Sequence, residues 1–87
     1  MSIFEFDDKK SMSNLKKHGI DFVKAQEIWH APDLVEVQAK SESETRFLVI
    51  ACIANTHWSA VITHRGSTIR IISVRHSRKT EVELYES

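Results

Sequence analysis

The chain is poor in the residues that break regular structure or cross-link a fold. Its 87 residues include one cysteine, two glycines and one proline. A lone cysteine, Cys52, cannot form an internal disulfide, which excludes a disulfide-stapled secreted scaffold. So few glycines and prolines argue against long disordered linkers, and a chain of this length forms one domain, here residues 1–87.

Long apolar segments are missing as well. The longest uninterrupted apolar run is Phe47–Ala54, which is far shorter than the roughly 20 residues that cross a bilayer. The first ten residues include Asp7 and Asp8 and contain no apolar core of signal-peptide length. We therefore expect a cytoplasmic protein.

Net charge is also absent, but the charges are distributed unevenly. Lysine plus arginine and aspartate plus glutamate each number 12, so the formal net charge is zero. The segment 61–79 nevertheless contains no acid and five cations, namely Arg65, Arg70, Arg75, Arg78 and Lys79. Four of the five arginines of the chain therefore lie in one short segment. Such a concentration indicates a surface that binds a polyanion.

The spacing of apolar residues predicts an α+β domain, with a small antiparallel sheet, two N-terminal helices and a short C-terminal helix. Strands are expected at 3–6, 34–37, 46–54, 58–63 and 68–74, and helices at 8–18, directly after Asp21 and at 78–85.

Local signals support this order of elements. Asp7 and Gly19 are suited to cap the first helix, whose clearest apolar anchors are Met12 and Leu15. The segment 46–54 is apolar on both faces, which predicts a central strand with Cys52 in the core. A charged loop is expected before it, at 40–45.

Alternation along the last strand separates its arginines. Strict period-two counting places Arg70 on one face and Arg75 on the other. One interpretation is structural, with a sheet-edge arginine paired to Glu5 or Glu36. The other is phosphate binding, because a guanidinium group matches phosphate oxygens with two parallel hydrogen bonds.

Five histidines are scattered along the chain, and none has a partner at metal-ligand spacing. No metal site or cofactor is therefore expected. His64 lies beside the basic strand and can act as an acid or base near neutral pH, although a surface histidine without a role is the commoner outcome. His18 follows two lysines at a helix end, where either capping or contact with a polyanion fits.

Two separated parts of the chain resemble the sequence signatures of BrnT-type toxins. The first comprises Phe4-Glu5-Phe6-Asp7, Lys10, Asn14, Lys17-His18-Gly19-Ile20-Asp21-Phe22 and Ala25. The second comprises Thr63-His64-Arg65-Gly66, Ile69-Arg70-Ile71-Ile72-Ser73-Val74-Arg75, Glu81 and Tyr85. The segment 46–50 fits the central strand of the family. The chain departs from the pattern at Phe6, His64, Val74 and Ser77, where tryptophan, an acid, alanine and alanine are usual.

The resemblance implies a RelE-like fold and a ribonuclease toxin of a type II toxin–antitoxin pair. It also implies a BrnA-like antitoxin partner, which binds operator DNA through a ribbon-helix-helix domain, and repression of the operon by the hetero-oligomeric complex. We predict a metal-independent endoribonuclease without a cofactor. The residues predicted to carry catalysis are Arg65, Arg70, Arg75, His64 and Tyr85, and those predicted to bind RNA are Lys17, His18, Ser73, Arg78 and Lys79.

The alternative is a non-catalytic or degenerate module with the toxin fold. Its basic face would dock an acidic antitoxin segment, and the protein would contribute only to DNA-bound repression. The sequence does not distinguish this interpretation from an active ribonuclease.

Overall fold

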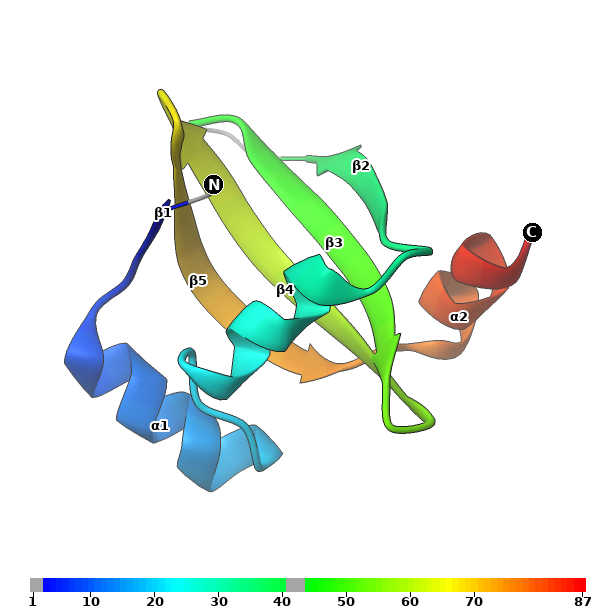
Figure 1. Cartoon of the computed structure of the whole chain (residues 1–87), viewed down its shortest axis with the longest axis horizontal. Coiled ribbons are helices and arrows are strands. Elements are labelled where there is room, and N and C mark those ends of the chain that lie inside the picture. The colour runs from blue at the N-terminus through cyan, green and yellow to red at the C-terminus, as the bar shows by residue number, and fades with distance from the viewer. Residues whose placement is uncertain (1–2, 41–43) are drawn as a thin grey trace.

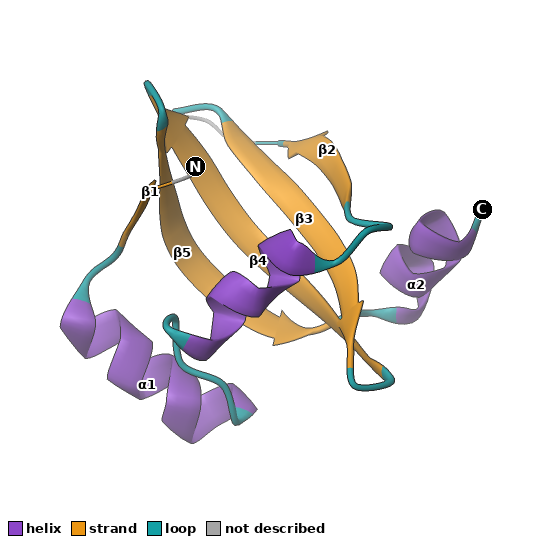
Figure 2. Ribbon diagram, viewed as in Figure 1, coloured by secondary structure: helices purple, strands orange, loops and turns teal. Residues whose placement is uncertain are grey.

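A computed structural model describes residues 3–40 and 44–87 of the chain. Within them the chain forms a five-stranded sheet in the order β1-β5-β4-β3-β2, accompanied by three helices (Figures 1 and 2). The elements are β1 (Ile3–Glu5), α1 (Asp8–His18), the 3-10 helix η1 (Lys24–His30), β2 (Val35–Ala39), β3 (Arg46–Ile53), β4 (Thr56–Arg65), β5 (Thr68–His76) and α2 (Lys79–Glu86). The predicted α+β class is confirmed, and the five strands follow one another along the chain as expected. The predicted loop at 40–45 lies partly outside the described residues.

The sheet is mostly antiparallel, which corrects the expectation of a purely antiparallel one. β2, β3, β4 and β5 pair antiparallel in succession, whereas β1 pairs parallel with β5. The parallel pair joins the two strands that lie farthest apart in the sequence. Residue patterns indicate where a strand lies but not the direction of its partner. The pairing also places Glu5 directly beside Arg70.

The second helix is a 3-10 helix, where an α-helix was predicted. The Asp21 side chain accepts a hydrogen bond from the Lys24 backbone N–H at 2.8 Å, in the turn that leads into η1. Ala25 and Ile28 are buried, and Trp29 packs edge-on against Phe4 with ring centroids 4.9 Å apart. Ala25, Ile28 and Trp29 therefore reach the core or pack against it from a 3-10 helix.

One face of the sheet carries the hydrophobic core, under α1 and η1 (Figure 1). The buried residues of this cluster are Ile20, Phe22, Ala25, Ile28, Val49, Ala51, Ala60, Ile62, Ile69, Ile71 and Val74. We call the other side of the sheet the open face. It includes Glu5, Arg65, Arg70, Ser73 and Arg75, and α2 packs against β3. Cys52 is only half-buried and lies outside the core cluster, so its placement in the core was wrong.

A β-bulge in β5 decides which residues share the open face. Thr63 pairs with Arg70 and Ser59 pairs with Arg75, and the register shifts between Val61 and Ile62. Residues directly opposite each other in an antiparallel pair have side chains on the same face. Thr63 and Ser59 are four residues apart on one strand, so they share a face, and so do Arg70 and Arg75. The opposite-face prediction was wrong because the bulge adds one residue to the count.

Helix α1 is held to the sheet by polar side chains rather than by the predicted apolar anchors. Met12 and Leu15 are 56% and 40% exposed, whereas Ser11 and Asn14 are buried. The Ser11 hydroxyl accepts a hydrogen bond from the Phe22 N–H at 2.9 Å. The Asn14 amide accepts from the Val74 N–H at 3.1 Å and donates to the Ile20 carbonyl at 2.7 Å. The bond to Val74 satisfies a backbone N–H of β5 beyond the end of β1, and the other two satisfy backbone groups in the segment that follows α1.

The helix caps and hairpin turns follow sequence signals. Asp7 accepts from the Lys10 N–H at 3.1 Å, and Gly19 closes α1 with a φ of 79°. The β3–β4 turn uses Ala54 and Asn55, both with positive φ, as tight hairpins require. No helix in the described part of the chain has the length and apolar character needed to span a membrane.

Candidate functional site on the open face of the sheet

Two arginines converge on one carboxylate near the start of β5. We call Arg65, Arg70 and Glu5 the arginine cluster. Guanidinium nitrogens of Arg65 and Arg70 lie 3.7 Å and 3.8 Å from Glu5 Oε1. A second carboxylate, that of Glu44, lies 3.7 Å from Arg65. These separations give electrostatic attraction without hydrogen bonding. The structural pairing of arginine with Glu5, one of the two interpretations from the sequence, is therefore present for both residues.

The cluster extends across the sheet to Arg46, which sequence reasoning missed. Continuing the β3–β4 register by one residue pairs Arg46 with Thr63, and Thr63 in turn pairs with Arg70. These side chains therefore share the open face. The Arg46 Nε atom is buried and has no hydrogen-bond partner among residues 3–40 and 44–87. Its place as a cation at the start of an apolar strand was visible in the sequence. Its position beside Arg70 and Thr63 could be found only from the register of the sheet.

Arg75 has a different environment from the arginine cluster. Its guanidinium group donates two hydrogen bonds to Glu81 on α2, at 2.7 Å and 2.8 Å. Glu81 Oε1 also accepts from the Ser59 hydroxyl at 2.9 Å and from the Arg78 N–H at 2.8 Å. The Ser59 and Ser77 hydroxyls are 2.7 Å apart. We call Arg75, Glu81, Ser59 and Ser77 the α2 anchor.

The α2 anchor holds Glu81 in its ionised form. The Arg75 hydrogen bonds, together with those from Arg78 and Ser59, lower the pKa of Glu81 to about 2, against a partial burial that acts to raise it. The hydrogen bonds to Glu81 in turn raise the pKa of Arg75 above its ordinary value. The side chains of Arg75 and Glu81 are 23% and 11% exposed. The pair therefore fastens α2 to the sheet.

His64 lies apart from the arginine cluster, on the other face of the sheet. It pairs with Ile69, a core residue, and so points to the face opposite Arg65. Its Nε2 atom lies 2.9 Å from Glu36 Oε2, and its ring packs edge-on against Phe47. Glu36, the other acid proposed as an arginine partner, is thus used by His64.

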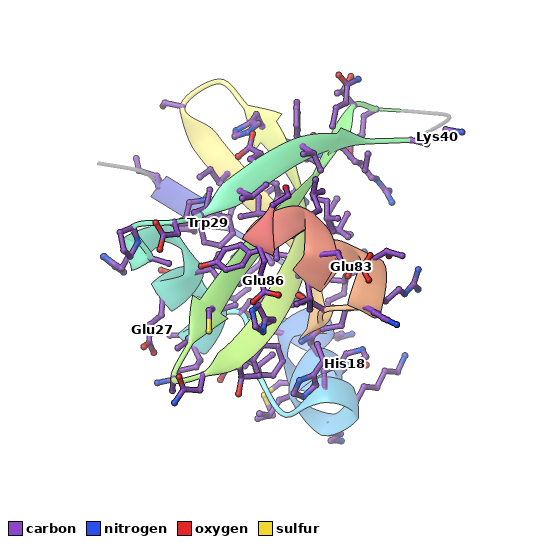
Figure 3. All side chains as sticks on the ribbon, turned by 90° about the vertical axis from the view of Figure 1, so that its right-hand side faces the viewer. His18, Glu27, Trp29, Lys40, Glu83 and Glu86 are labelled. Atoms are coloured by element: carbon purple, nitrogen blue, oxygen red, sulfur yellow. The ribbon has the colours of Figure 1, made fainter. Side chains whose placement is uncertain are left out.

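The remaining C-terminal residues lie on or beside α2. Tyr85 packs edge-on against His57, with ring centroids 5.5 Å apart, at the end of the sheet far from Arg65. Arg78 and Lys79 are exposed at the start of α2. Figure 3 shows α2 in front of the sheet with Glu83 and Glu86 on it. This helix therefore presents both signs of charge.

Three predicted RNA-binding residues come together at the junction of α1 and β5. Lys17, His18 and Ser73 line a pocket of about 190 Å³. Its other lining residues are Lys10, Ser13, Asn14 and Ile72. The pocket contains two lysines and a histidine and no acid, and the bulge of β5 forms one wall. Lys10 was missed by sequence reasoning because its distance to Ser73 depends on how α1 docks.

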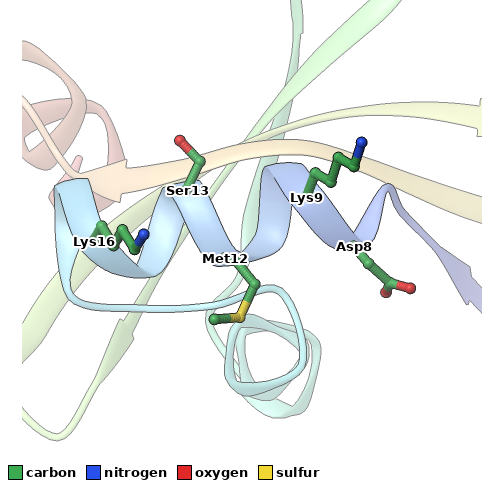
Figure 4. Close-up of a pocket in the computed structure, with 5 residues that line it drawn as sticks. All are labelled: Asp8, Lys9, Met12, Ser13 and Lys16. Atoms are coloured by element: carbon green, nitrogen blue, oxygen red, sulfur yellow. The ribbon is translucent and has the colours of Figure 1, made fainter.

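A second hollow lies along α1 alone. It is lined by Asp8, Lys9, Met12, Ser13 and Lys16. Figure 4 shows Lys9 and Ser13 on one side of the helix and Asp8 and Met12 on the other. The side chains do not converge on one point, and their charges are mixed. Among the described residues there is no group of three or more histidine, cysteine, aspartate or glutamate side chains that could hold a metal ion.

The fold and the site define a small α+β protein whose sheet presents arginines suited to a polyanion. The sequence model of the family described as ribonuclease toxin, BrnT, of type II toxin-antitoxin system matches residues 6–81. The chain therefore belongs to the BrnT toxin family, and the resemblance predicted from the sequence is confirmed. Family membership implies a ribonuclease toxin and an antitoxin partner. A search of curated proteins finds no match to the chain.

Proposed function

We propose that this BrnT-family protein is a metal-independent endoribonuclease with a RelE-like fold. The observation that carries the proposal is the arginine cluster, where two guanidinium groups share one carboxylate at 3.7 Å and 3.8 Å on the open face. The reaction is transesterification, in which the 2′-hydroxyl of RNA attacks the adjacent phosphorus and leaves a 2′,3′-cyclic phosphate. Fixed guanidinium groups supply the positive charge that a metal ion supplies in other nucleases.

Arg65 and Arg70 bind the scissile phosphate in this proposal. Their contacts to Glu5 are too long for hydrogen bonds, so their N–H groups keep donor capacity for phosphate oxygens. Both side chains are accessible, at 53% and 30% exposed. Arg75 was predicted to join them. Its bidentate bond to Glu81 favours instead a structural role, in which it holds α2 on the sheet.

RNA continues from the arginine cluster along the edge of β5. The pocket formed by Lys17, His18 and Ser73 lies on that path and suits a flanking phosphate. Arg78 and Lys79 attract the backbone at the start of α2. His64 and Tyr85 were predicted to transfer protons, but they lie on the other face and at the far end of the sheet. We therefore assign neither of them to the reacting phosphate.

The antitoxin partner is proposed to be BrnA-like, with a ribbon-helix-helix domain that binds operator DNA. An acidic antitoxin segment fits the open face, because Arg65 and Arg70 already attract carboxylates there. Such a segment would compete directly with RNA. The resulting hetero-oligomer would repress its own operon in the cytoplasm, and the toxin would reach operator DNA only through the antitoxin.

The test is cleavage of RNA by purified protein in EDTA. Arg70→Ala should lower the cleavage rate by about 10²–10³-fold, the loss expected when one donor to a developing oxyanion is removed. Lys24→Ala is the matched control, since it removes a cation that lies on η1 and pairs with Glu27. Cleavage that requires added metal, or that survives in Arg70→Ala, would contradict the proposal.

A second candidate is a non-catalytic module that uses the same face to bind its antitoxin. The observation in its favour is that Arg65, Arg70 and Arg75 all pair with carboxylates of the chain itself. This candidate predicts no cleavage in either wild type or Arg70→Ala. It also predicts that Arg70→Ala weakens antitoxin binding, whereas Lys24→Ala does not.

A further inference from the structure

Glu5 lies between two arginines on the open face of the sheet. β1 is three residues long, and its parallel pairing with β5 sets Glu5 beside Arg70 on the open face. Arg65 reaches the same carboxylate from β4. Within the arginine cluster, Glu5 is thus the one group able to accept a proton, because a guanidinium group carries donors and no acceptor.

The Glu5 oxygen between the two arginines is an acceptor that the protein leaves without a donor. Glu5 Oε1 is buried, and among residues 3–40 and 44–87 it has no hydrogen-bond partner. The Arg65 and Arg70 nitrogens at 3.7 Å and 3.8 Å are too distant to donate to it. The side chain as a whole is 40% exposed. Because Oε1 itself is closed to solvent, a ligand hydroxyl has access to this side chain only through its exposed part, on the open face.

We propose that Glu5 is the general base of the cleavage reaction, an inference that rests on the proposed function. A phosphate held by Arg65 and Arg70 lies next to the Glu5 carboxylate, which is within reach of both residues. The ribose 2′-hydroxyl adjoins that phosphate in RNA. The cluster thus holds the electrophile with guanidinium groups and the nucleophile with a carboxylate.

The proton and electron movements balance within this arrangement. Glu5 takes the 2′-hydroxyl proton as the O2′–P bond forms, and Arg65 and Arg70 stabilise the charge on the non-bridging oxygens. The P–O5′ bond breaks, and its electron pair stays on the 5′-oxygen. That oxygen takes a proton from water. The hydroxide so formed takes the proton from Glu5, which restores the carboxylate.

The test compares Glu5→Gln with Glu44→Gln, because both carboxylates lie 3.7 Å from Arg65. Cleavage of an RNA oligonucleotide is measured in EDTA. Binding is measured separately with the same oligonucleotide carrying 2′-O-methyl groups, which cannot be cleaved. Glu5→Gln should slow cleavage by about 10²–10⁴-fold, the usual contribution of a general base, while binding stays equal or tightens. Glu44→Gln should cleave at the wild-type rate.

Glu5→Asp covers the case in which the neutral variant fails to fold. It keeps the negative charge between the arginines but withdraws the carboxylate by one methylene group, so cleavage should fall about tenfold or more with binding retained. A Glu5→Gln rate within threefold of wild type, a wild-type rate in Glu5→Asp, or equal losses of binding and cleavage would overturn the inference. If Arg70→Ala abolishes cleavage while the Glu5 variants cleave at the wild-type rate, the proposed function stands and only the role of Glu5 fails. A wild-type protein that does not cleave RNA would refute both.

Discussion

The two ends of strand β5 use the same residue type in different ways. Near the start of the strand, Arg70 lies 3.8 Å from Glu5 without hydrogen bonding to it. Near the end of the strand, Arg75 makes two hydrogen bonds to Glu81 at 2.7 Å and 2.8 Å. Both arginines project from the open face and are separated by roughly 15 Å of strand. The arginine cluster and the α2 anchor are therefore distinct sites on one element.

The comparison shows that the geometry of the carboxylate partner decides what an arginine can do. Glu81 is fixed by Ser59 and by the Arg78 N–H, so it can hold the Arg75 guanidinium in bidentate geometry. Glu5 Oε1 accepts no hydrogen bond from the described residues. A saturated pair stabilises the fold, whereas a loose pair leaves donors and acceptors available to a ligand.

The largest expected difference between the two sites is in stability. Arg75→Ala leaves Glu81 without its main partner, and removing one member of a partly buried pair costs about 2–4 kcal/mol of unfolding free energy. Arg70→Ala should cost about 1 kcal/mol or less, because its ion pair is long and solvent-screened. Urea denaturation of both variants measures the difference. Equal destabilisation would remove the distinction between cluster and anchor.

The pH dependence of stability should also be traceable to the α2 anchor. The pKa of Glu81 is about 2 in the folded protein, below its ordinary value of 4.5. Stability from this group is therefore present above pH 4.5 and is lost as the pH falls from 4.5 towards 2. The loss is at most about 3 kcal/mol. Glu81→Gln should flatten the stability curve over this interval. A curve as steep as that of wild type would show that other carboxylates dominate.

The salt dependence of RNA binding should distinguish the arginines one by one. Each phosphate contact contributes about −0.7 to the slope of log affinity against log salt for single strands. Arg65→Ala and Arg70→Ala should each make the slope shallower by about that amount. Arg75→Ala should leave it unchanged, provided the variant is folded. Filter binding at several salt concentrations, with uncleavable 2′-O-methyl RNA, provides the measurement.

The smallest expected effect concerns Ser77, where the resemblance to the family led us to expect alanine. Its hydroxyl lies 2.7 Å from that of Ser59, which donates to Glu81. Ser77→Ala should lower the unfolding free energy by about 1 kcal/mol or less, the usual net value of one hydrogen bond, without changing RNA cleavage. A loss as large as that of Arg75→Ala would show that Ser77 is essential to the α2 anchor.

Local signals in the sequence predicted most of the secondary structure. Asp7 and Gly19 cap α1 as expected, and the strand positions were correct to within a few residues. These features depend on neighbours in the chain. The anchoring of α1 was mispredicted, because the Ser11 and Asn14 side chains bond to backbone groups of distant residues. Short polar side chains on a helix give no sign of such partners.

The candidate site depends on how the strands pair, so only part of it could be predicted from the sequence. The concentration of arginines was visible at once, and so was Glu5 as a potential partner. The bulge that returns Arg70 and Arg75 to one face was not visible, because period-two counting assumes a regular ladder. The parallel pairing of β1 with β5, which sets Glu5 beside Arg70, also required the topology.

The most direct test of the two-site account compares RNA cleavage per folded molecule in Arg70→Ala and Arg75→Ala. Folded fractions are taken from circular dichroism on the same samples, and cleavage is measured in EDTA. The account predicts that Arg70→Ala is folded but loses cleavage by about 10²-fold or more, whereas Arg75→Ala cleaves near the wild-type rate for its folded fraction. An equal loss per folded molecule in both variants would contradict it, because Arg75 would then act on the phosphate itself.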